Sequence, residues 1–260
     1  MHAIGWSLGW LVFAASGAYR RRFLDNARQA GVSRAQWMAA VGESGKMVLE
    51  LPRLWLGRAV PAEIDGEHPV ESALALGKGV LILTPHLGCF EVIGQVYARR
   101  FGPLQPMTAM FRPPRQAWLH TIVSTARARP GLLTAPATMA GVKQMIKALR
   151  QGQCVCVLPD QVPPQGMGRW TPFFGREAYT MTLAVRLAQQ TGATVLLAWG
   201  ERLSMGRGFC VHFEPLPDAV PADGEAAVRQ LNQAMEGLIR RSPGQYLWGY
   251  ARYKQPRHAL

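Results

Sequence analysis

A histidine and a glutamate five residues apart are the residues of this sequence best suited to chemistry. The stretch GVLILTPHLGCFE begins as a short branched apolar run, typical of a buried strand, and then presents His86 and Glu91. Gly88 between them permits a tight turn from strand to helix, which would bring the carboxylate back to the ring. A carboxylate on one ring nitrogen orients an imidazole, so the other nitrogen becomes a general base toward a hydroxyl. The spacing alone is weak evidence, because it arises often by chance and a single histidine is usually structural.

Polar side chains also follow two other apolar runs, at the points where the predicted strands end. Arg112 follows MTAMF, and Asp160 and Gln161 follow CVCVLP. Ligands of open α/β sheets bind outside the carboxyl ends of the strands, so parallel strands would bring these side chains to the edge that carries His86. There Arg112 would meet a developing oxyanion or a substrate phosphate, unless it is a solvated loop arginine. Asp160 would orient a catalytic or substrate group, unless it only caps the following turn.

The sequence lacks the motifs of several well-known chemistries. It contains no Gly-x-Ser-x-Gly, no phosphate loop ending in Gly-Lys-Ser/Thr and no Gly-x-Gly-x-x-Gly after a predicted strand. These absences favour direct attack by a deprotonated acceptor, without a covalent enzyme intermediate. No second histidine lies at ligand spacing from His86, so the sequence predicts neither a metal site nor a cofactor.

The aromatic pair Phe173 and Phe174 lies in the segment TPFFG, after a glycine-rich loop. Such a pair suits the lining of an apolar channel or contact with lipid, and it suits packing within the core equally well. We therefore treat both residues as candidates for substrate binding, with a purely structural role as the alternative.

The elements that must position these residues alternate between short apolar runs and helical patterns. This alternation predicts an α/β fold with one mostly parallel central sheet and helices on both faces. No repeat, low-complexity tract or linker interrupts it, so residues 23–260 are expected to form one domain. The predicted strands are Gly79–Thr84, Met107–Phe111, Leu132–Ala135, Cys154–Leu158, Thr194–Trp199 and Phe209–Glu214. The predicted helices are Gly31–Trp55, with Ser33 and Gln36 at capping-box spacing, His68–Gly79, Phe90–Arg100, Arg115–Ala128, Met139–Arg150, Thr182–Thr191 and Glu225–Arg241.

Residues 1–22 are predicted to form an apolar, membrane-associated anchor helix. The segment Ala3–Tyr19 carries no charged side chain and contains two tryptophans, and Arg20–Arg22 follow it. A secretory signal would carry its positive charge before the apolar part. A spanning helix needs about 20 apolar residues, so this segment either spans a thinned bilayer or lies in the interface. Arginines at its end would leave the rest of the protein cytoplasmic, whereas the alternative is an ordinary core helix.

The charge composition indicates anionic partners. The 260 residues include 29 lysines and arginines against 16 aspartates and glutamates, a formal net charge of +13. Nucleic acid, an acidic membrane face, phosphorylated substrates and acidic proteins all fit this charge. Nucleic acid is disfavoured, because no recognition helix, zinc-ligand spacing or aromatic RNA-binding signature is present. The four cysteines have neither the spacing of a zinc site nor the density of a disulfide scaffold, which indicates a reducing compartment.

Five sequence blocks, in order, resemble those of a known family. LILTPHLGCFE, MFRPPR, VLPDQ, TPFFGREAYTMTLAVRLA and PGQYLWGYARYK together resemble the late acyltransferases of lipid A biosynthesis, within the lysophospholipid acyltransferase superfamily. The resemblance implies transfer of a fatty acyl chain from an acyl carrier protein thioester to a hydroxyl of a lipid A precursor, at the cytoplasmic face of the bacterial inner membrane. It implies that His86 and Glu91 are catalytic. It also maps the family's arginine and aspartate onto Arg112 and Asp160, which together with Gln161 we assign to substrate binding.

The C-terminal block departs from the family pattern, and alternatives to this function stay open. Tyr250 and Ala251 stand where the family often has a histidine and an arginine, so that only Arg252 remains. The closest rival is an acyltransferase of the same superfamily that uses another phospholipid or glycolipid. Glycerol phosphate acyl transfer usually goes with His-x-x-x-x-Asp and a Glu-Gly-Thr-Arg block, which this sequence lacks. A thioesterase that activates water with the same residue pair, and a basic nucleic-acid binder, belong to other classes.

Overall fold

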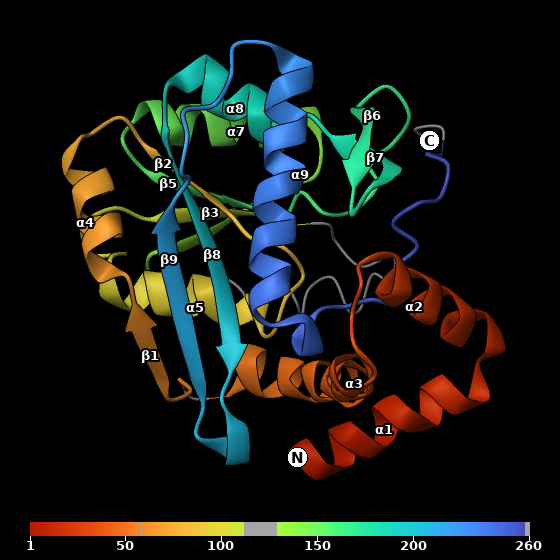
Figure 1. Cartoon of the computed structure of the whole chain (residues 1–260). Coiled ribbons are helices and arrows are strands. Elements are labelled where there is room, and N and C mark those ends of the chain that lie inside the picture. Colours follow the sequence, from red (N-terminus) through yellow and green to blue (C-terminus); the bar gives the residue numbers. More distant parts are fainter. Residues whose placement is uncertain (58, 112–128, 258–260) are drawn as a thin grey trace.

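The computed structural model describes residues 1–57, 59–111 and 129–257, and this part of the chain is built around a central mixed sheet (Figure 1). Seven strands from the described residues form the sheet, in the order β1-β9-β8-β2-β5-β3-β4. Neighbouring strands pair in parallel except β8 and β9, so the prediction of a mostly parallel sheet is confirmed. The strands are β1 (Ala62–Asp65), β2 (Val80–Leu83), β3 (Met107–Phe111), β4 (Leu132–Pro136), β5 (Cys154–Val157), β8 (Thr194–Arg202) and β9 (Phe209–Pro215).

Helices cover both faces of this sheet, as the alternating pattern predicted (Figure 1). One face carries α4 (Glu67–Ala75) and α5 (Phe90–Arg100), and the other carries α7 (Met139–Arg150), α8 (Leu183–Thr191) and α9 (Gly224–Arg241). The central strand β2 is buried on both sides. Val80 and Ile82 face the core under α4 and α5, and Leu81 and Leu83 face the core under α7, α8 and α9. A continuous apolar run is what a strand buried on both faces requires.

A separate hairpin of β6 (Gly168–Phe173) and β7 (Arg176–Met181) packs against α9. Its two-residue turn consists of Phe174 and Gly175, whose φ values of 48° and 75° fit the left-handed conformations of a type I′ turn. The sequence analysis did not predict these strands. Pro172 within β6 disfavours a strand by sequence rules, but it is tolerated here because a two-stranded hairpin consists of edge strands.

The single anchor helix predicted over residues 1–22 is absent, and two helices take its place. Helix α1 (His2–Ala15) ends at Ser16, whose extended backbone has φ −109° and ψ 98°. The Ser16 hydroxyl accepts the Tyr19 N–H at 3.3 Å and so caps α2 (Gly17–Gln29). Within residues 1–57, 59–111 and 129–257, no helix is long and apolar enough to cross a bilayer.

Helix α3 (Arg34–Leu56) lies directly against α1, and glycines set the distance between them. A Cβ atom at Gly9 would collide with the Val41 carbonyl oxygen, so the two backbones approach as closely as sterics permit. The predicted capping box of α3 is confirmed: the Ser33 hydroxyl accepts the Gln36 N–H, and the Gln36 side chain accepts the Ser33 N–H.

Several predicted elements differ in extent from the observed ones. Strand β8 continues to Arg202, three residues beyond the predicted end, because its antiparallel pairing with β9 extends as far as the Arg202–Phe209 pair. Strand β1 was not predicted. The predicted helix Arg115–Ala128 lies outside the described residues.

Candidate active site

His86 lies in the loop that follows β2, at the carboxyl edge of the sheet. Backbone hydrogen bonds hold this loop in place: the Gly88 N–H donates to the Gln245 carbonyl at 3.0 Å, and the Cys89 N–H donates to the Gly200 carbonyl at 2.7 Å. Gly88 has a φ of 58°, and a Cβ atom there would collide with the Gly200 carbonyl oxygen. The tight glycine turn predicted at this position is confirmed, and a larger residue would strain it.

The buried carboxylate of Asp160 binds His86 at two points. His86 Nδ1 lies 2.6 Å from Asp160 Oδ1, and the His86 backbone N–H donates to Oδ2 at 3.0 Å. The Tyr246 hydroxyl donates to the same Oδ2 at 3.1 Å. Burial alone would raise the pKa of the Asp160 carboxyl, but the charge of His86, its two hydrogen bonds to the carboxylate and the charge of Arg252 hold the pKa below its usual value. The carboxylate is therefore ionised at neutral pH.

Strand register explains why His86 and Asp160 meet. Strands β2 and β5 are parallel neighbours, and Leu83 of β2 is aligned with Val157 of β5. His86 and Asp160 each stand three residues beyond this aligned pair, so the two chains leave the sheet side by side. Sequence analysis expected both residues at the same edge of the sheet, and the structure brings them into direct contact.

The second ring nitrogen of His86 faces Gln161. Gln161 Nε2 lies 3.0 Å from His86 Nε2, and the Phe90 ring packs edge-on at 4.8 Å between ring centroids. These contacts fit the tautomer in which Nδ1 donates its proton to Asp160 and the Nε2 lone pair accepts from the Gln161 amide. A hydroxyl that replaces the Gln161 amide would meet an unprotonated nitrogen, the arrangement that a general base requires.

Glu91 was predicted to bind the imidazole, and the structure places a different carboxylate there. Asp160 is hydrogen-bonded to His86 Nδ1, whereas Glu91, in the first turn of α5, accepts a hydrogen bond from the Trp55 indole N–H at 3.4 Å. Helix α5 begins only at Phe90, after the turn at Gly88. Arg112 lies outside the described residues.

The aromatic pair of the hairpin and Arg252 of the C-terminal block pack into the core. The side chains of Phe173 and Phe174 are buried, as the structural alternative expected, and neither is exposed for contact with a bilayer. Arg252 is buried as well, and it donates to the Tyr179 carbonyl at 2.8 Å and to Thr180 Oγ1 at 2.6 Å. It thus braces the hairpin. The assignment of the two phenylalanines to substrate binding stays a prediction.

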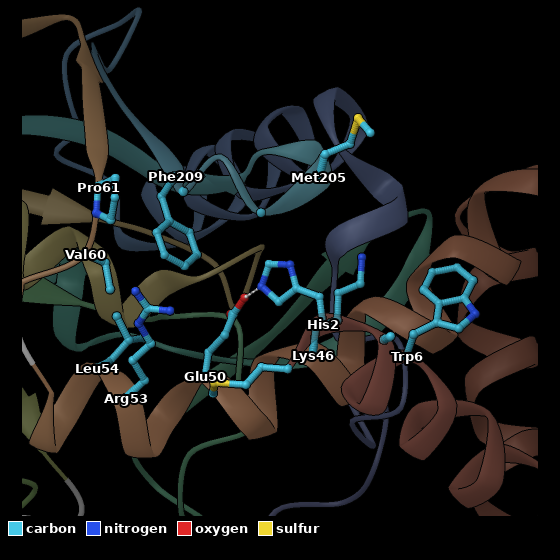
Figure 2. Close-up of a pocket in the computed structure, with 14 residues that line it drawn as sticks. His2, Trp6, Lys46, Glu50, Arg53, Leu54, Val60, Pro61, Met205 and Phe209 are labelled. Carbon is cyan, nitrogen blue, oxygen red and sulfur yellow. Dashed lines mark hydrogen bonds and ion pairs between the residues drawn. The ribbon is translucent and has the colours of Figure 1, made fainter.

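A cavity of about 590 Å³ lies apart from this histidine, between α1, α3 and the turn that joins β8 to β9 (Figure 2). Neither His86 nor Asp160 lines it. Sequence analysis did not predict this cavity, because residues from four separate segments form it.

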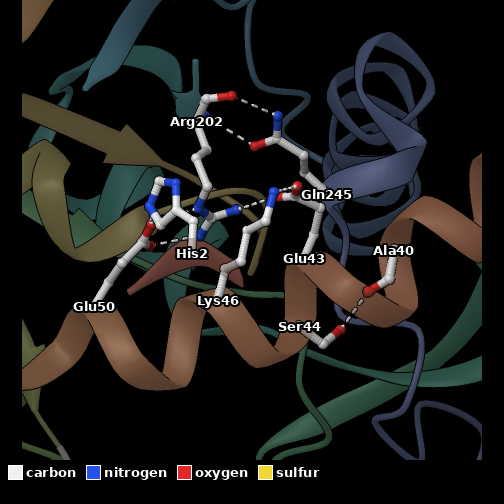
Figure 3. A network of polar contacts seen from close by, with 8 residues as sticks. All are labelled: His2, Ala40, Glu43, Ser44, Lys46, Glu50, Arg202 and Gln245. Carbon is white, nitrogen blue, oxygen red and sulfur yellow. Dashed lines mark hydrogen bonds and ion pairs between the residues drawn. The ribbon is translucent and has the colours of Figure 1, made fainter. Parts of the chain in front are cut away.

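A buried ion-pair network connects α3 to the loop of His86 (Figure 3). Arg202 donates to both carboxylate oxygens of Glu50, at 2.6 and 2.7 Å, and to Glu43 at 2.6 Å. The Gln245 side chain binds the backbone N–H and carbonyl of Arg202, while the Gln245 backbone carbonyl accepts from the Gly88 N–H. The network therefore fixes the loop of His86 relative to the N-terminal helices.

Comparison with known proteins decides the family. A family model described as bacterial lipid A biosynthesis acyltransferase matches residues 47–255, most of the chain. The chain belongs to this family. This finding confirms the resemblance that the five sequence blocks indicated.

Members of this lipid A acyltransferase family from two organisms illustrate the similarity. The lipid A biosynthesis palmitoleoyltransferase of Escherichia coli K12 is 26% identical over 193 residues, which cover 74% of this chain and 61% of that protein. The lauroyltransferase of the same organism is 28% identical over 81% of this chain and 68% of its own length. A lipid A biosynthesis acyltransferase of Haemophilus influenzae is 25% identical over 72% of this chain and 57% of its own length. The chain thus spans about three fifths of the first of these relatives.

Proposed function

We propose that the protein transfers a fatty acyl chain from an acyl carrier protein thioester to a hydroxyl of a lipid A precursor. The observation that carries this proposal is His86, held by ionised Asp160 on one nitrogen and open to exchange with an incoming hydroxyl on the other. Membership of the family and the names of the relatives support the class of acceptor.

The proposed reaction is a direct acyl transfer. His86 Nε2 takes the proton of the acceptor hydroxyl as its oxygen attacks the thioester carbonyl, and the imidazolium that forms is stabilised by Asp160. The C–S bond then breaks, and the departing thiolate takes the proton from the imidazolium. A positioned general base accelerates such a step by about 10²–10⁴-fold.

Two further residues belong to the proposed site. Glu91 lies at the start of α5, next to the loop of His86, and supplies a second carboxylate there. Arg112 directly follows β3, which neighbours β5, and we assign its guanidinium to the oxyanion or to a substrate phosphate.

The proposed location is the cytoplasmic face of the bacterial inner membrane, with α1 in the interface. Helix α1 buries one side against α3, but Ile4 and Leu11 on its outer side are 67% and 65% exposed. Arg20–Arg22 follow on α2, where they suit anionic lipid headgroups. Exposed apolar side chains close in sequence to these arginines suit contact with an anionic membrane surface.

Product analysis tests this function. Purified protein and its His86→Ala variant are incubated with acyl carrier protein thioesters and a lipid A precursor, and the lipids are analysed by mass spectrometry. We expect the mass of one acyl chain to be added by the wild type and a loss of turnover of about 10²-fold or more in the variant. Free fatty acid as the sole product would instead identify a thioesterase, and full activity of the folded variant would refute the role of His86.

A further inference from the structure

We propose that the cavity between α1, α3 and the β8–β9 turn binds an amphiphile that carries a phosphate. Its volume of about 590 Å³ lies within the range of small-molecule sites and holds a headgroup with part of a hydrocarbon chain. Since neither His86 nor Asp160 lines the cavity, this proposal does not depend on the proposed acyl transfer.

The cavity opens at the same edge of the sheet as the loop of His86. Strand β9 begins at Phe209 opposite Arg202, where β8 ends, and Phe209 lines the cavity. Strand β1 runs parallel to β9, so Pro61, just before β1, lies at this edge too. A ligand here would therefore lie at the same edge of the sheet as the candidate active site, and next to the helix that we place in the membrane interface.

Arg53 provides the cation for a phosphate. Figure 2 shows Arg53 and Lys46 rising from α3 into the cavity, on either side of Glu50. Both oxygens of Glu50 are occupied, because Arg202 binds them at 2.6 and 2.7 Å and His2 approaches Oε1 at 2.8 Å. Within the described residues Arg53 is exposed and has no ion-pair partner. Its planar guanidinium matches two oxygens of a phosphate.

A second cation and the apolar lining complete the site. The Lys46 ammonium is bound by Glu43 and lies 5.2 Å from the centre of the Trp6 ring, with further donor capacity toward the cavity. Met1 and Trp6 contribute apolar surface, and their side chains are 58% and 36% exposed. Met205, in the β8–β9 turn above the cavity, is 98% exposed. An inorganic anion would leave this apolar surface in water, whereas an amphiphile would cover it.

Calorimetric titration with dihexanoyl phosphatidylglycerol, kept below its micelle concentration, tests the site with a monomeric probe. We expect saturable binding to the wild type and an increase in Kd of about tenfold in Arg53→Gln, the loss of one charge-assisted contact. Arg186→Gln is the matched control, because it removes the same charge from the exposed side of α8, far from the cavity. Its Kd should equal that of the wild type.

Ala3→Trp separates pocket binding from general affinity for lipid. Ala3 is exposed and lines the cavity, so an indole there fills the space that the probe needs. An added tryptophan would strengthen nonspecific contact with lipid, but it should abolish saturable binding if the cavity is the site. The proposal would be overturned if the wild type did not bind the probe, or if Ala3→Trp bound it as the wild type does. It would also be overturned if the two arginine variants had equal Kd values, or if phosphate-free dihexanoylglycerol bound equally tightly.

Two sources share this chemistry: a glycerophospholipid of the bilayer and a phosphorylated lipid A precursor. Displacement of the bound probe by the precursor would assign the cavity to the acceptor, and retention of the probe would assign it to a bilayer lipid. The His86→Ala variant should bind the probe as the wild type does. Binding without acylation would therefore leave this site standing even if the proposed function failed.

Discussion

At the scale of single residues, the candidate site consists of an imidazole between an anion and an amide. Asp160 accepts a hydrogen bond from His86 Nδ1 and so keeps the proton on that nitrogen, and the Tyr246 hydroxyl donates to Oδ2 of the same carboxylate. Burial and the charge of Asp160 raise the pKa of the Tyr246 hydroxyl, which therefore remains a neutral donor to the carboxylate. Tyr246 thus keeps Asp160 hydrogen-bonded, and Asp160 keeps His86 in the tautomer that leaves Nε2 unprotonated, as a base at Nε2 requires.

The lowered pKa of Asp160 predicts a pH-dependent contribution to stability. Because its pKa is lower in the folded protein than in the unfolded chain, the carboxylate stabilises the fold above the unfolded value of about 4. This contribution is lost as the pH falls through the folded value. Urea unfolding of wild type and Asp160→Asn should give a stability difference that narrows from pH 6 to pH 3. A difference that stays constant over this range would contradict the assignment.

Two residues of the site, His86 and Asp160, could be found from the sequence, but their pairing could not. His86 and Asp160 were identifiable because each follows an apolar strand. Which carboxylate binds the imidazole depends on the β2–β5 register, and strand order cannot be read from one sequence. The short spacing between His86 and Glu91 therefore favoured Glu91 as the carboxylate that binds the imidazole. Tyr246 gave no signal, because its hydroxyl reaches Asp160 across 86 positions of the chain.

At the scale of elements, the turn after β2 determines where His86 stands. Gly88 combines a positive φ with close contact to the Gly200 carbonyl. Gly88→Ala should therefore lower both thermal stability and turnover, with a cost of about 1–3 kcal/mol for the strained backbone and a further cost for the collision. Thermal melts and acylation rates measure the two effects.

Gly192→Ala is the matched control for this change. Gly192 ends α8 with a φ of 69° and has open space where a Cβ would stand. The variant should lose stability through backbone strain alone and keep its turnover. If both variants behaved alike, the contact at Gly200 would not be important.

Element prediction succeeded for the strands that are buried on both faces, and it missed the edge strand β1. The strands β2 and β5 are continuous apolar runs that a sequence pattern detects. Strand β1 reads Ala-Glu-Ile-Asp and lies at the edge of the sheet, so its alternation over four residues is a weak signal. The break at Ser16 was missed because serine is compatible with both a helix interior and a helix cap.

At the scale of the whole molecule, the N-terminal helices and the active-site edge lie next to each other (Figure 1). The Arg202 network joins α3 to the loop of His86, and the outer side of α1 remains apolar and exposed. A protein that rests on the bilayer through α1 would hold its catalytic edge close to lipid substrates. The net charge of +13 would add attraction to anionic lipids.

This orientation predicts which surface changes weaken membrane binding. Ile4→Gln combined with Leu11→Gln should reduce partitioning onto phosphatidylglycerol vesicles by about tenfold or more, since each buried aliphatic side chain contributes about 1.5–3 kcal/mol. Leu104→Gln, at an equally exposed leucine after α5, serves as the control and should bind as the wild type does. Vesicle flotation measures the bound fraction. Equal loss in the control would place the lipid contact elsewhere.

The most direct test of the account is the rate of acyl transfer by Asp160→Asn, measured beside Tyr246→Phe under saturating substrates. An asparagine amide would donate toward His86 Nδ1 and shift the proton to Nε2, so we predict a fall in kcat of about 10²–10⁴-fold, with the folded state confirmed by thermal melting. Tyr246→Phe should lose far less, because it leaves the carboxylate on the ring. An Asp160→Asn variant with wild-type kcat would contradict the central claim that Asp160 prepares His86 as the base.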